Sequence, residues 1–324
     1  MRIFVTGASG WIASAVVPEL LAAGHQVLGL ARSDAAAAKV AALGADVQRG
    51  DLNDLEGLRA AAATSDGVVH LGYNHDFSQM GAAAGTDRAA IDAFGEVLAG
   101  SDRPLLIASG VLGLTNDRPA TEDDRPGAAA HPRIANAAAT LALADRGVRP
   151  IVVRFAPTVH GEGDYGFTKV LAGIARDKGV SAYVGDGTNV WPAVHRLDAG
   201  ALVAKAIDGG PAGTTAHPIA EQGALAGTTT HPVAEQGGLA GTIVHAIAEQ
   251  GVSSREIAEA IGRGLDLPVK SIPADQAADH FGWIGPIFAA DCPTSSEKTQ
   301  RLLDWHPSHN TLIEDLDAGY YFGA

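Results

Sequence analysis

The first residues of the chain that could do chemistry form a glycine-containing turn. Gly7 and Gly10 follow a short apolar run at residues 3–5 and precede a stretch of helical character that reaches Gly24. Glycine lets the backbone come within contact distance of a pyrophosphate, and a helix N-terminus presents free N–H groups to its charge. A strand before and a helix after the turn are the context that dinucleotide binding requires. We therefore expect dinucleotide contacts from Thr6, Gly7, Ser9, Gly10, Trp11 and Ile12.

The side chains after the second apolar run, residues 26–31, predict which dinucleotide is bound. An acidic residue at this position would bind the ribose hydroxyls of NAD. The chain instead has Arg32, which can pair with a 2′-phosphate through two hydrogen bonds, and Ser33, which offers a second donor. Asp34 comes two residues later and can simply start the next helix. This pattern favours NADP over NAD.

The spacing Thr6-Gly7-x-x-Gly10-x-x-Ala13 resembles the nucleotide loop of the short-chain dehydrogenase/reductase superfamily. It is most similar to the extended and atypical branch, which holds sugar-nucleotide epimerases, dehydratases and carbonyl reductases. The resemblance covers nearly the whole chain and implies further cofactor contacts at the ends of later strands. Asp51 could instead be a helix-start residue and His70 a core histidine. The implied contacts are Asp51, Leu52, His70, Leu71, Gly72, Arg133 and Pro157.

Hydride transfer to a carbonyl also needs a proton donor beside the oxygen and a hydroxyl to orient it. The resemblance implies that Ser109, after the fifth apolar run, is that hydroxyl, although a turn serine is the plain alternative. The family's Tyr-x-x-x-Lys pair is missing from its usual place, where Ala129 and Arg133 stand. An arginine can bind the cofactor ribose, but an alanine cannot donate a proton.

Several other residues could supply the proton or touch the substrate. A Tyr-x-x-x-Lys spacing does occur at Tyr165 and Lys169, on the other side of the sixth apolar run, and Tyr73 and His160 are rival acids on loops that face the cofactor. The donor therefore stays open at this point. The resemblance implies that the substrate side is shaped by His160, Trp191 and His195.

Apolar runs and helical segments alternate through the first half of the chain. We expect strands at residues 3–5, 26–31, 46–50, 67–71, 104–109 and 150–155, and helices at 35–43, 55–63, 85–99 and 134–146. The runs lack strict alternation, which indicates strands buried on both faces of a parallel sheet. The fold class predicted is α/β, a Rossmann-type doubly wound parallel sheet with a small C-terminal substrate lobe. Later helices are expected at 166–178, within 194–207, at 255–265 after a Ser253–Glu256 capping box, and as segments of the tail, residues 298–321, around 305–307.

A 14-residue segment occurs three times in tandem, beginning at Ala212, Ala226 and Ala240. Each copy has a histidine at the same place: His217, His231 and His245. Because strand-like repeats would not bring these histidines together, we favour a duplication without chemistry over a metal site. The third copy lacks proline, so we expect it to fill a sheet position; the first copy is the alternative.

These patterns divide the chain into a cofactor domain and a lobe. Residues 1–156 and 191–210 are expected to form the NADP-binding domain, and 157–190 and 239–324 the lobe. The extra repeat copies, 211–238, would form a hairpin or flap.

Composition limits the classes of partner. The formal net charge is −14 with 23 lysines and arginines, which argues against nucleic acid or an anionic membrane surface. One cysteine, Cys292, no apolar run of transmembrane length and an N-terminal core strand fit a cytoplasmic protein with a small-molecule substrate. Small apolar residues in 87–99 and 134–146 resemble the family's dimer-forming helices and predict a homodimer.

The function expected is an NADP-dependent reductase of the short-chain type. It would reduce a carbonyl, imine or activated alkene of a small organic molecule with a non-standard proton donor. The alternative is a protein that binds NADP without redox turnover, as a sensor or as the scaffold of a cyclase or isomerase. Nucleotide-sugar epimerisation or dehydration is less favoured, because those reactions also depend on the missing tyrosine.

Overall fold

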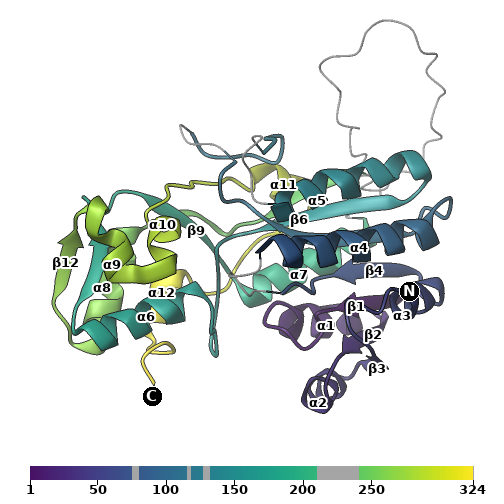
Figure 1. Cartoon of the computed structure of the whole chain (residues 1–324), viewed down its shortest axis with the longest axis horizontal. Coiled ribbons are helices and arrows are strands. Elements are labelled where there is room, and N and C mark those ends of the chain that lie inside the picture. The colour runs from purple at the N-terminus through teal and green to yellow at the C-terminus, as the bar shows by residue number, and fades with distance from the viewer. Residues whose placement is uncertain (75–79, 115–117, 127–131, 210–240, 324) are drawn as a thin grey trace, which may run out of the picture.

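A seven-stranded parallel sheet forms the centre of the molecule (Figure 1). The computed structural model describes residues 1–74, 80–114, 118–126, 132–209 and 241–323. The strand order is β10-β6-β5-β4-β1-β2-β3, and every neighbouring pair is parallel. This confirms the predicted fold class. The strands are β1 Arg2–Thr6, β2 Gln26–Ala31, β3 Asp46–Arg49, β4 Gly67–His70, β5 Pro104–Gly110, β6 Arg149–Phe155 and β10 Thr242–Ala246.

Helices cover both faces of this sheet, which buries the apolar strands on two sides. One apolar core holds Val16 and Leu20 of α1 with Leu202 of α7. The other holds Leu58 of α3 and Phe94 of α4 against the opposite face. The helices are α1 Ala13–Ala22, α2 Asp34–Ala42, α3 Leu55–Ala63, α4 Met80–Leu98, α5 Pro132–Leu141 and α7 Arg196–Asp208.

The lobe stands beside the sheet and has its own apolar core around Trp191, Phe281 and Tyr321 (Figure 1). It contains a three-stranded and a two-stranded sheet. The expected capping box opens α8, with both the Ser253 and the Glu256 hydrogen bonds present. The strands are β7 Thr158–His160, β9 Val190–His195, β11 Glu249–Ser253, β8 Ser181–Val184 and β12 Val269–Ile272. The helices are α6 Phe167–Lys178, α8 Ser254–Leu265, α9 Ala277–Phe281, α10 Gly285–Phe288 and α12 Leu312–Asp317.

The bounds of several expected helices differ from the structure. The helix expected within 194–207 begins only at Arg196, because the His195 side chain accepts a hydrogen bond from the Leu197 N–H and caps it. The tail is helical on either side of residues 305–307 rather than there. Its first helix, α11 Glu297–Leu303, leads into Trp305, which is buried in the core of the main domain.

The strand of the third repeat copy, β10, pairs with β6 at the edge of the main sheet. This strand therefore belongs to the main sheet, and the predicted domain bounds, with residues 239–324 in the lobe, stay a prediction. His245 on β10 is fully buried, and burial lowers its pKa to about 4. Its ring bonds the Ser295 carbonyl at 2.8 Å and Arg154 at 3.3 Å, a structural role. Residues 211–238, with His217 and His231, lie outside the described residues.

Two further features of the described residues are the state of the cysteine and the character of the helices. Cys292 is a free, buried cysteine, and burial raises the pKa of its thiol to about 12. In the part of the chain that the structure describes, no helix combines the length and the apolar character needed to cross a membrane.

Candidate active site

The glycine turn between β1 and α1 is held against the end of β4 with no space for a side chain. Gly7 has φ +66°, and the Gly10 N–H donates to the Gly7 carbonyl at 2.8 Å. A Cβ on Gly7 would lie 2.7 Å from the Gly72 nitrogen. Among the described residues no side chain caps α1 at Ile12, so its first N–H groups stay open to an anion. This open cradle fits a dinucleotide.

The end of β2 carries the residues expected to select NADP. Arg32 and Ser33 are exposed there. The Ser33 hydroxyl accepts from the Ala36 N–H at 3.2 Å as the N-cap of α2, and it retains a proton to donate. Asp34 pairs with Arg49 at 3.1 Å on the neighbouring strand end, so its charge is partly offset. These placements are compatible with binding of a 2′-phosphate, and the preference for NADP stays a prediction.

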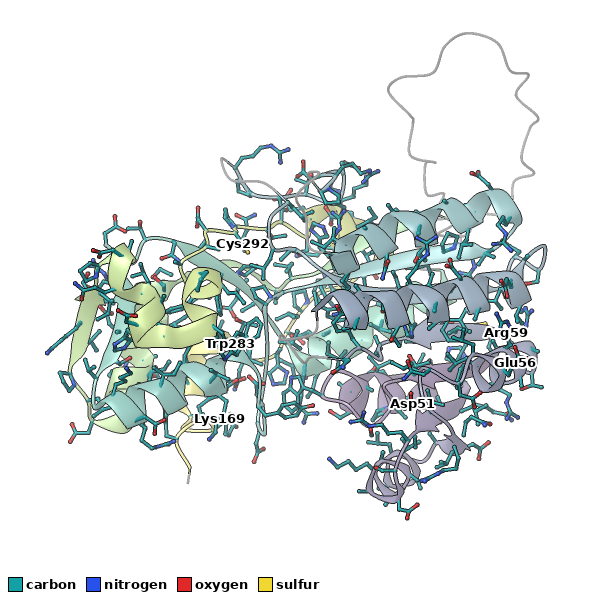
Figure 2. The ribbon with its side chains drawn as sticks, viewed as in Figure 1. Asp51, Glu56, Arg59, Lys169, Trp283 and Cys292 are labelled. Carbon is teal, nitrogen blue, oxygen red and sulfur yellow. The ribbon has the colours of Figure 1, made fainter. Side chains whose placement is uncertain are left out.

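Asp51 and Leu52 lie at the end of β3, on the main-domain side of the molecule (Figure 2). The Asp51 carboxylate accepts from the Asn53 backbone at 2.9 Å and from its amide at 2.6 Å, which shapes the turn before α3. Asp54, and not Asp51, caps that helix. Leu52 lies under Gly72, 3.3 Å from where its Cβ would be. Their expected contacts with the cofactor stay predictions.

A chain of buried polar side chains connects the glycine turn to α4 and α5. The Thr6 hydroxyl lies 2.6 Å from His70 Nδ1 and accepts from the Gly72 N–H at 3.1 Å. His70 Nε2 lies 3.2 Å from Asp87, and the Asn136 amide donates to the same carboxylate at 2.6 Å. Burial raises the pKa of Asp87, but the bonds from His70 and Asn136 outweigh it and leave the pKa below its usual value. The carboxylate is therefore ionised and His70 donates to it.

Arg133, in the first turn of α5, lies over the ring of Tyr73 with its guanidinium carbon 4.1 Å from the ring centroid. Burial raises the pKa of Tyr73 and lowers that of Arg133. Arg133 opposes the shift of Tyr73, and Asp87 reinforces it. The arginine at the family's lysine position is thus paired with a tyrosine from the end of β4. Ala129, at the family's tyrosine position, lies outside the described residues.

Ser109 lies at the end of β5 and is 4% exposed. Its hydroxyl has no hydrogen-bond partner among the described residues. A buried hydroxyl without a partner costs free energy, so Ser109 stays a candidate to bond a ligand. Ser109 is two residues beyond Ile107, which pairs with His70 in the sheet, so Ser109 at the end of β5 and Tyr73 after β4 belong to neighbouring strands.

Tyr165 and Lys169 have different partners from each other. Tyr165 is 67% exposed, and its ring meets Trp11 edge-on at 6.0 Å between centroids. Lys169, on the lobe (Figure 2), donates to the carbonyls of Tyr321 at 3.0 Å and Gly323 at 3.3 Å. The lysine therefore holds the C-terminal segment to α6, which gives it a structural partner in place of the tyrosine.

Trp11 joins the glycine turn to the lobe. Its indole N–H donates to the Val159 carbonyl at 2.7 Å, and Arg196 lies over its ring at 5.0 Å. Pro157, which precedes β7 in this same connection, is partly buried. The turn that is expected to bind the cofactor is therefore fixed to the strand that leads into the lobe.

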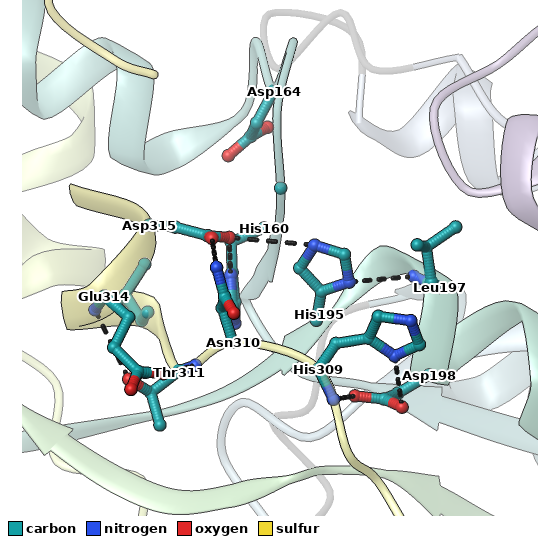
Figure 3. Close-up of polar contacts among 12 residues, drawn as sticks. His160, Asp164, His195, Leu197, Asp198, His309, Asn310, Thr311, Glu314 and Asp315 are labelled. Atoms are coloured by element: carbon teal, nitrogen blue, oxygen red, sulfur yellow. Dashed lines mark hydrogen bonds and ion pairs between the residues drawn. The ribbon is translucent and has the colours of Figure 1, made fainter. Parts of the chain in front are cut away.

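The three residues expected on the substrate side are buried. Trp191 is 1% exposed and donates to the Ile287 carbonyl at 3.1 Å, so it belongs to the core of the lobe. His160 is 0% exposed and lies 2.6 Å from Asp315 (Figure 3). His195 is 9% exposed and its ring stacks on that of His309 at 4.9 Å. These contacts place the three side chains in the framework of the fold, and their expected role on the substrate side stays a prediction.

The pKa values of His160 and His195 (Figure 3) are shifted in opposite directions. Burial lowers the pKa of His160, but bonds with Asp315 and Glu249 outweigh it and raise the pKa above its usual value. Burial lowers the pKa of His195, which lies 3.8 Å from Asp315. Asp315 has a lowered pKa, since these histidines and Asn310 outweigh its burial. Within the described residues no three such side chains are placed to hold a metal ion.

Comparison with known proteins decides the family. Residues 7–182, more than half of the chain, match the NAD(P)H-binding family. The chain belongs to the NAD(P)H-binding family. An uncharacterized protein of Schizosaccharomyces pombe, C2A9.02, is 42% identical over 323 residues, which are 99% of this chain and 100% of that one. A Stigmatella aurantiaca 4-hydroxy-2-methyl-3-oxo-4-farnesyl-3,4-dihydroquinoline-1-oxide ketoreductase is 43% identical over 70 residues, 22% of this chain and 21% of its own.

A solved structure extends the likeness in fold beyond the residues of the family match. The structure of UDP-glucose 4-epimerase from Thermotoga maritima with UDP-glucose aligns with a TM-score of 0.71 at 16% identity, covering 99% of this chain and 98% of that one. This likeness shows the fold alone. The family match shows NAD(P)H binding, and the structural likeness confirms the fold that the resemblance to the short-chain superfamily implies.

Proposed function

We propose that this NAD(P)H-binding protein is an NADP-dependent reductase of a carbonyl, imine or activated alkene in a small organic molecule. The observation that carries the proposal is the Arg133 guanidinium over the Tyr73 ring, next to the glycine turn. In the proposed reductase, Tyr73 and the adjacent Arg133 cation take the place of the missing Tyr-x-x-x-Lys pair. The ketoreductase similarity supports a reductase, although it covers a short segment.

The cofactor would lie along the strand ends that the glycine turn begins. When bound, NADPH supplies the hydride. The backbone at Gly7 and Gly10 and the N-terminus of α1 would hold its pyrophosphate. Arg32 would pair with the 2′-phosphate, which NADH lacks.

Two side chains then act on the reacting group. The Ser109 hydroxyl donates a hydrogen bond to the carbonyl oxygen or imine nitrogen and orients it. The Tyr73 hydroxyl donates its proton to the same atom as hydride adds to the carbon, which yields an alcohol or an amine. Arg133 stabilises the phenolate left behind until solvent returns a proton.

The experiment follows NADPH absorbance with a panel of aldehydes, ketones and imines. We expect oxidation with at least one compound, and a fall in kcat of about 100-fold or more for Tyr73→Phe with NADPH affinity unchanged. Tyr183→Phe is the matched control, because Arg255 lies over its ring at 5.0 Å far from the glycine turn in sequence and on the lobe. Equal activity of the Tyr73 and Tyr183 variants would remove Tyr73 as the donor.

A second candidate is NADP binding without redox turnover, in a sensor or a cyclase or isomerase scaffold. It is favoured by alanine at position 129, where the family has its tyrosine. Tight NADPH binding with no oxidation across the panel would support it over the reductase.

A further inference from the structure

Asp87 is a buried carboxylate on α4 that sequence patterns did not single out. It is 4% exposed and has a partner on either side. His70 Nε2 lies 3.2 Å from one oxygen, and the Asn136 amide donates to the other at 2.6 Å. The same amide donates to the Ala84 carbonyl at 2.9 Å, one turn earlier on α4. The carboxylate therefore links β4, α4 and α5.

These partners lie next to the two residues proposed to act on the substrate. Asn136 is three positions after Arg133 on α5, which puts both on one side of the helix. His70 is the last residue of β4, three before Tyr73. A group that holds Asn136 and His70 together also sets where Arg133 and Tyr73 meet.

We propose that Asp87 is a positioning residue that, through Asn136 and His70, holds Arg133 over Tyr73 and offsets the charge of that guanidinium beside the Tyr73 hydroxyl. The inference rests on the proposed function for the donor role of Tyr73. The placement of Asp87 between His70 and Asn136 stands independently of it.

The charges around Tyr73 have opposite effects on its proton. Among the residues that the structure describes, the charged groups that act on Tyr73 include Arg133 from α5 and Asp87 from α4, and Asp87 is bonded by His70. A nearby cation favours the phenolate and a nearby anion favours the phenol. Without Asp87, the buried guanidinium would act on the tyrosine uncompensated. Burial raises the pKa of Tyr73 most, and Asp87 adds to it by offsetting part of the effect of Arg133.

The decisive experiment titrates Tyr73 itself and needs no turnover. Tyrosinate absorbance near 295 nm is recorded against pH for the protein and for Tyr73→Phe, and the difference isolates Tyr73. Asp87→Asn keeps the shape and removes the charge, and we expect the midpoint to fall by about one pH unit. Arg133→Gln should move it upward. Asp92→Asn, on the same helix but exposed and paired with Arg88, should leave it unchanged.

The pH dependence of kcat/KM for reduction gives the second measurement. Since the protonated tyrosine is the donor, activity should fall above the midpoint, and that fall should move downward in Asp87→Asn and upward in Arg133→Gln. Simple loss of packing would not give shifts of opposite sign. Asp87→Ser, also uncharged, serves if the asparagine variant does not fold.

The outcomes separate the two proposals. An unchanged midpoint in folded Asp87→Asn, or a shift in the same direction as Arg133→Gln, would overturn the role of Asp87. If the Tyr73 midpoint shifts as expected while kcat/KM shows no matching ionisation, the positioning by Asp87 stands and the donor role of Tyr73 fails.

Discussion

Two buried histidine–aspartate pairs lie in different regions of the molecule and have different surroundings. His70 and Asp87 are in the main domain, 3.2 Å apart, and lead through Thr6 to the glycine turn. His160 and Asp315 are at the junction with the lobe, 2.6 Å apart. The first pair borders Tyr73, which is only partly buried, whereas the second is enclosed. The neighbours of such a pair, and not the pair itself, therefore indicate a functional site.

The two pairs also differ in the segments that they join. His70 and Asp87 are 17 residues apart and lie on successive elements of one βαβ unit. His160 and Asp315 are 155 residues apart and fasten α12, near the C-terminus, to β7. We infer that the second pair stabilises the junction. The first pair serves the cofactor edge, by which we mean the strand ends around the glycine turn between β1 and α1.

The largest effect expected at the junction is on stability. Asp315→Ala leaves His160 buried without its closest partner, and breaking a buried charged pair costs about 3–5 kcal/mol of unfolding free energy. Urea denaturation measures this loss. The control is Asp317→Ala on the same helix, whose exposed pair with Arg263 at 2.8 Å contributes little. A folded, stable Asp315→Ala protein that had lost activity would contradict the structural role of this pair, because the junction would then act in the reaction.

At the cofactor edge the opposite result is expected. Ser109→Ala removes a hydroxyl with no partner among the described residues, so stability should be unchanged while kcat falls by about 100-fold. Ser65→Ala is the matched control, since its buried hydroxyl donates to the Ala61 carbonyl at 2.8 Å. That variant should lose about 1 kcal/mol of stability and keep its kcat. Loss of stability without loss of activity in Ser109→Ala would mean that the hydroxyl serves the fold.

The sequence predicted the cofactor edge better than the junction, for a physical reason. Strands buried on both faces and a glycine turn leave local patterns, and all six expected strands of the main sheet occur with small changes at their ends. The Arg133–Tyr73 contact joins segments 60 positions apart, which no local spacing encodes. The buried role of His160 depends on Asp315 from the far end of the chain.

Asp87 did leave a local signal that could have been used. It lies on the apolar side of α4 with the buried residues Ala84, Ala90 and Ile91. A carboxylate on a buried helix face must be paired, so this position alone predicts a polar partner inside the fold. Its partners, His70 and Asn136, could be identified only from the packed structure.

The smallest effect is expected at Arg32, which follows β2 at the cofactor edge. Arg32 is exposed, so a pairing with the 2′-phosphate is screened by solvent, and Arg32→Ala should raise the KM for NADPH about tenfold with the KM for NADH unchanged. Steady-state kinetics with both cofactors measure the ratio. Arg59→Ala is the control, because Arg59 on α3 pairs with Glu56 at 2.8 Å and Glu96 at 2.9 Å. Equal changes in the KM values for NADPH and NADH would show that Arg32 does not bind the 2′-phosphate. Arg32 would then not distinguish the two cofactors.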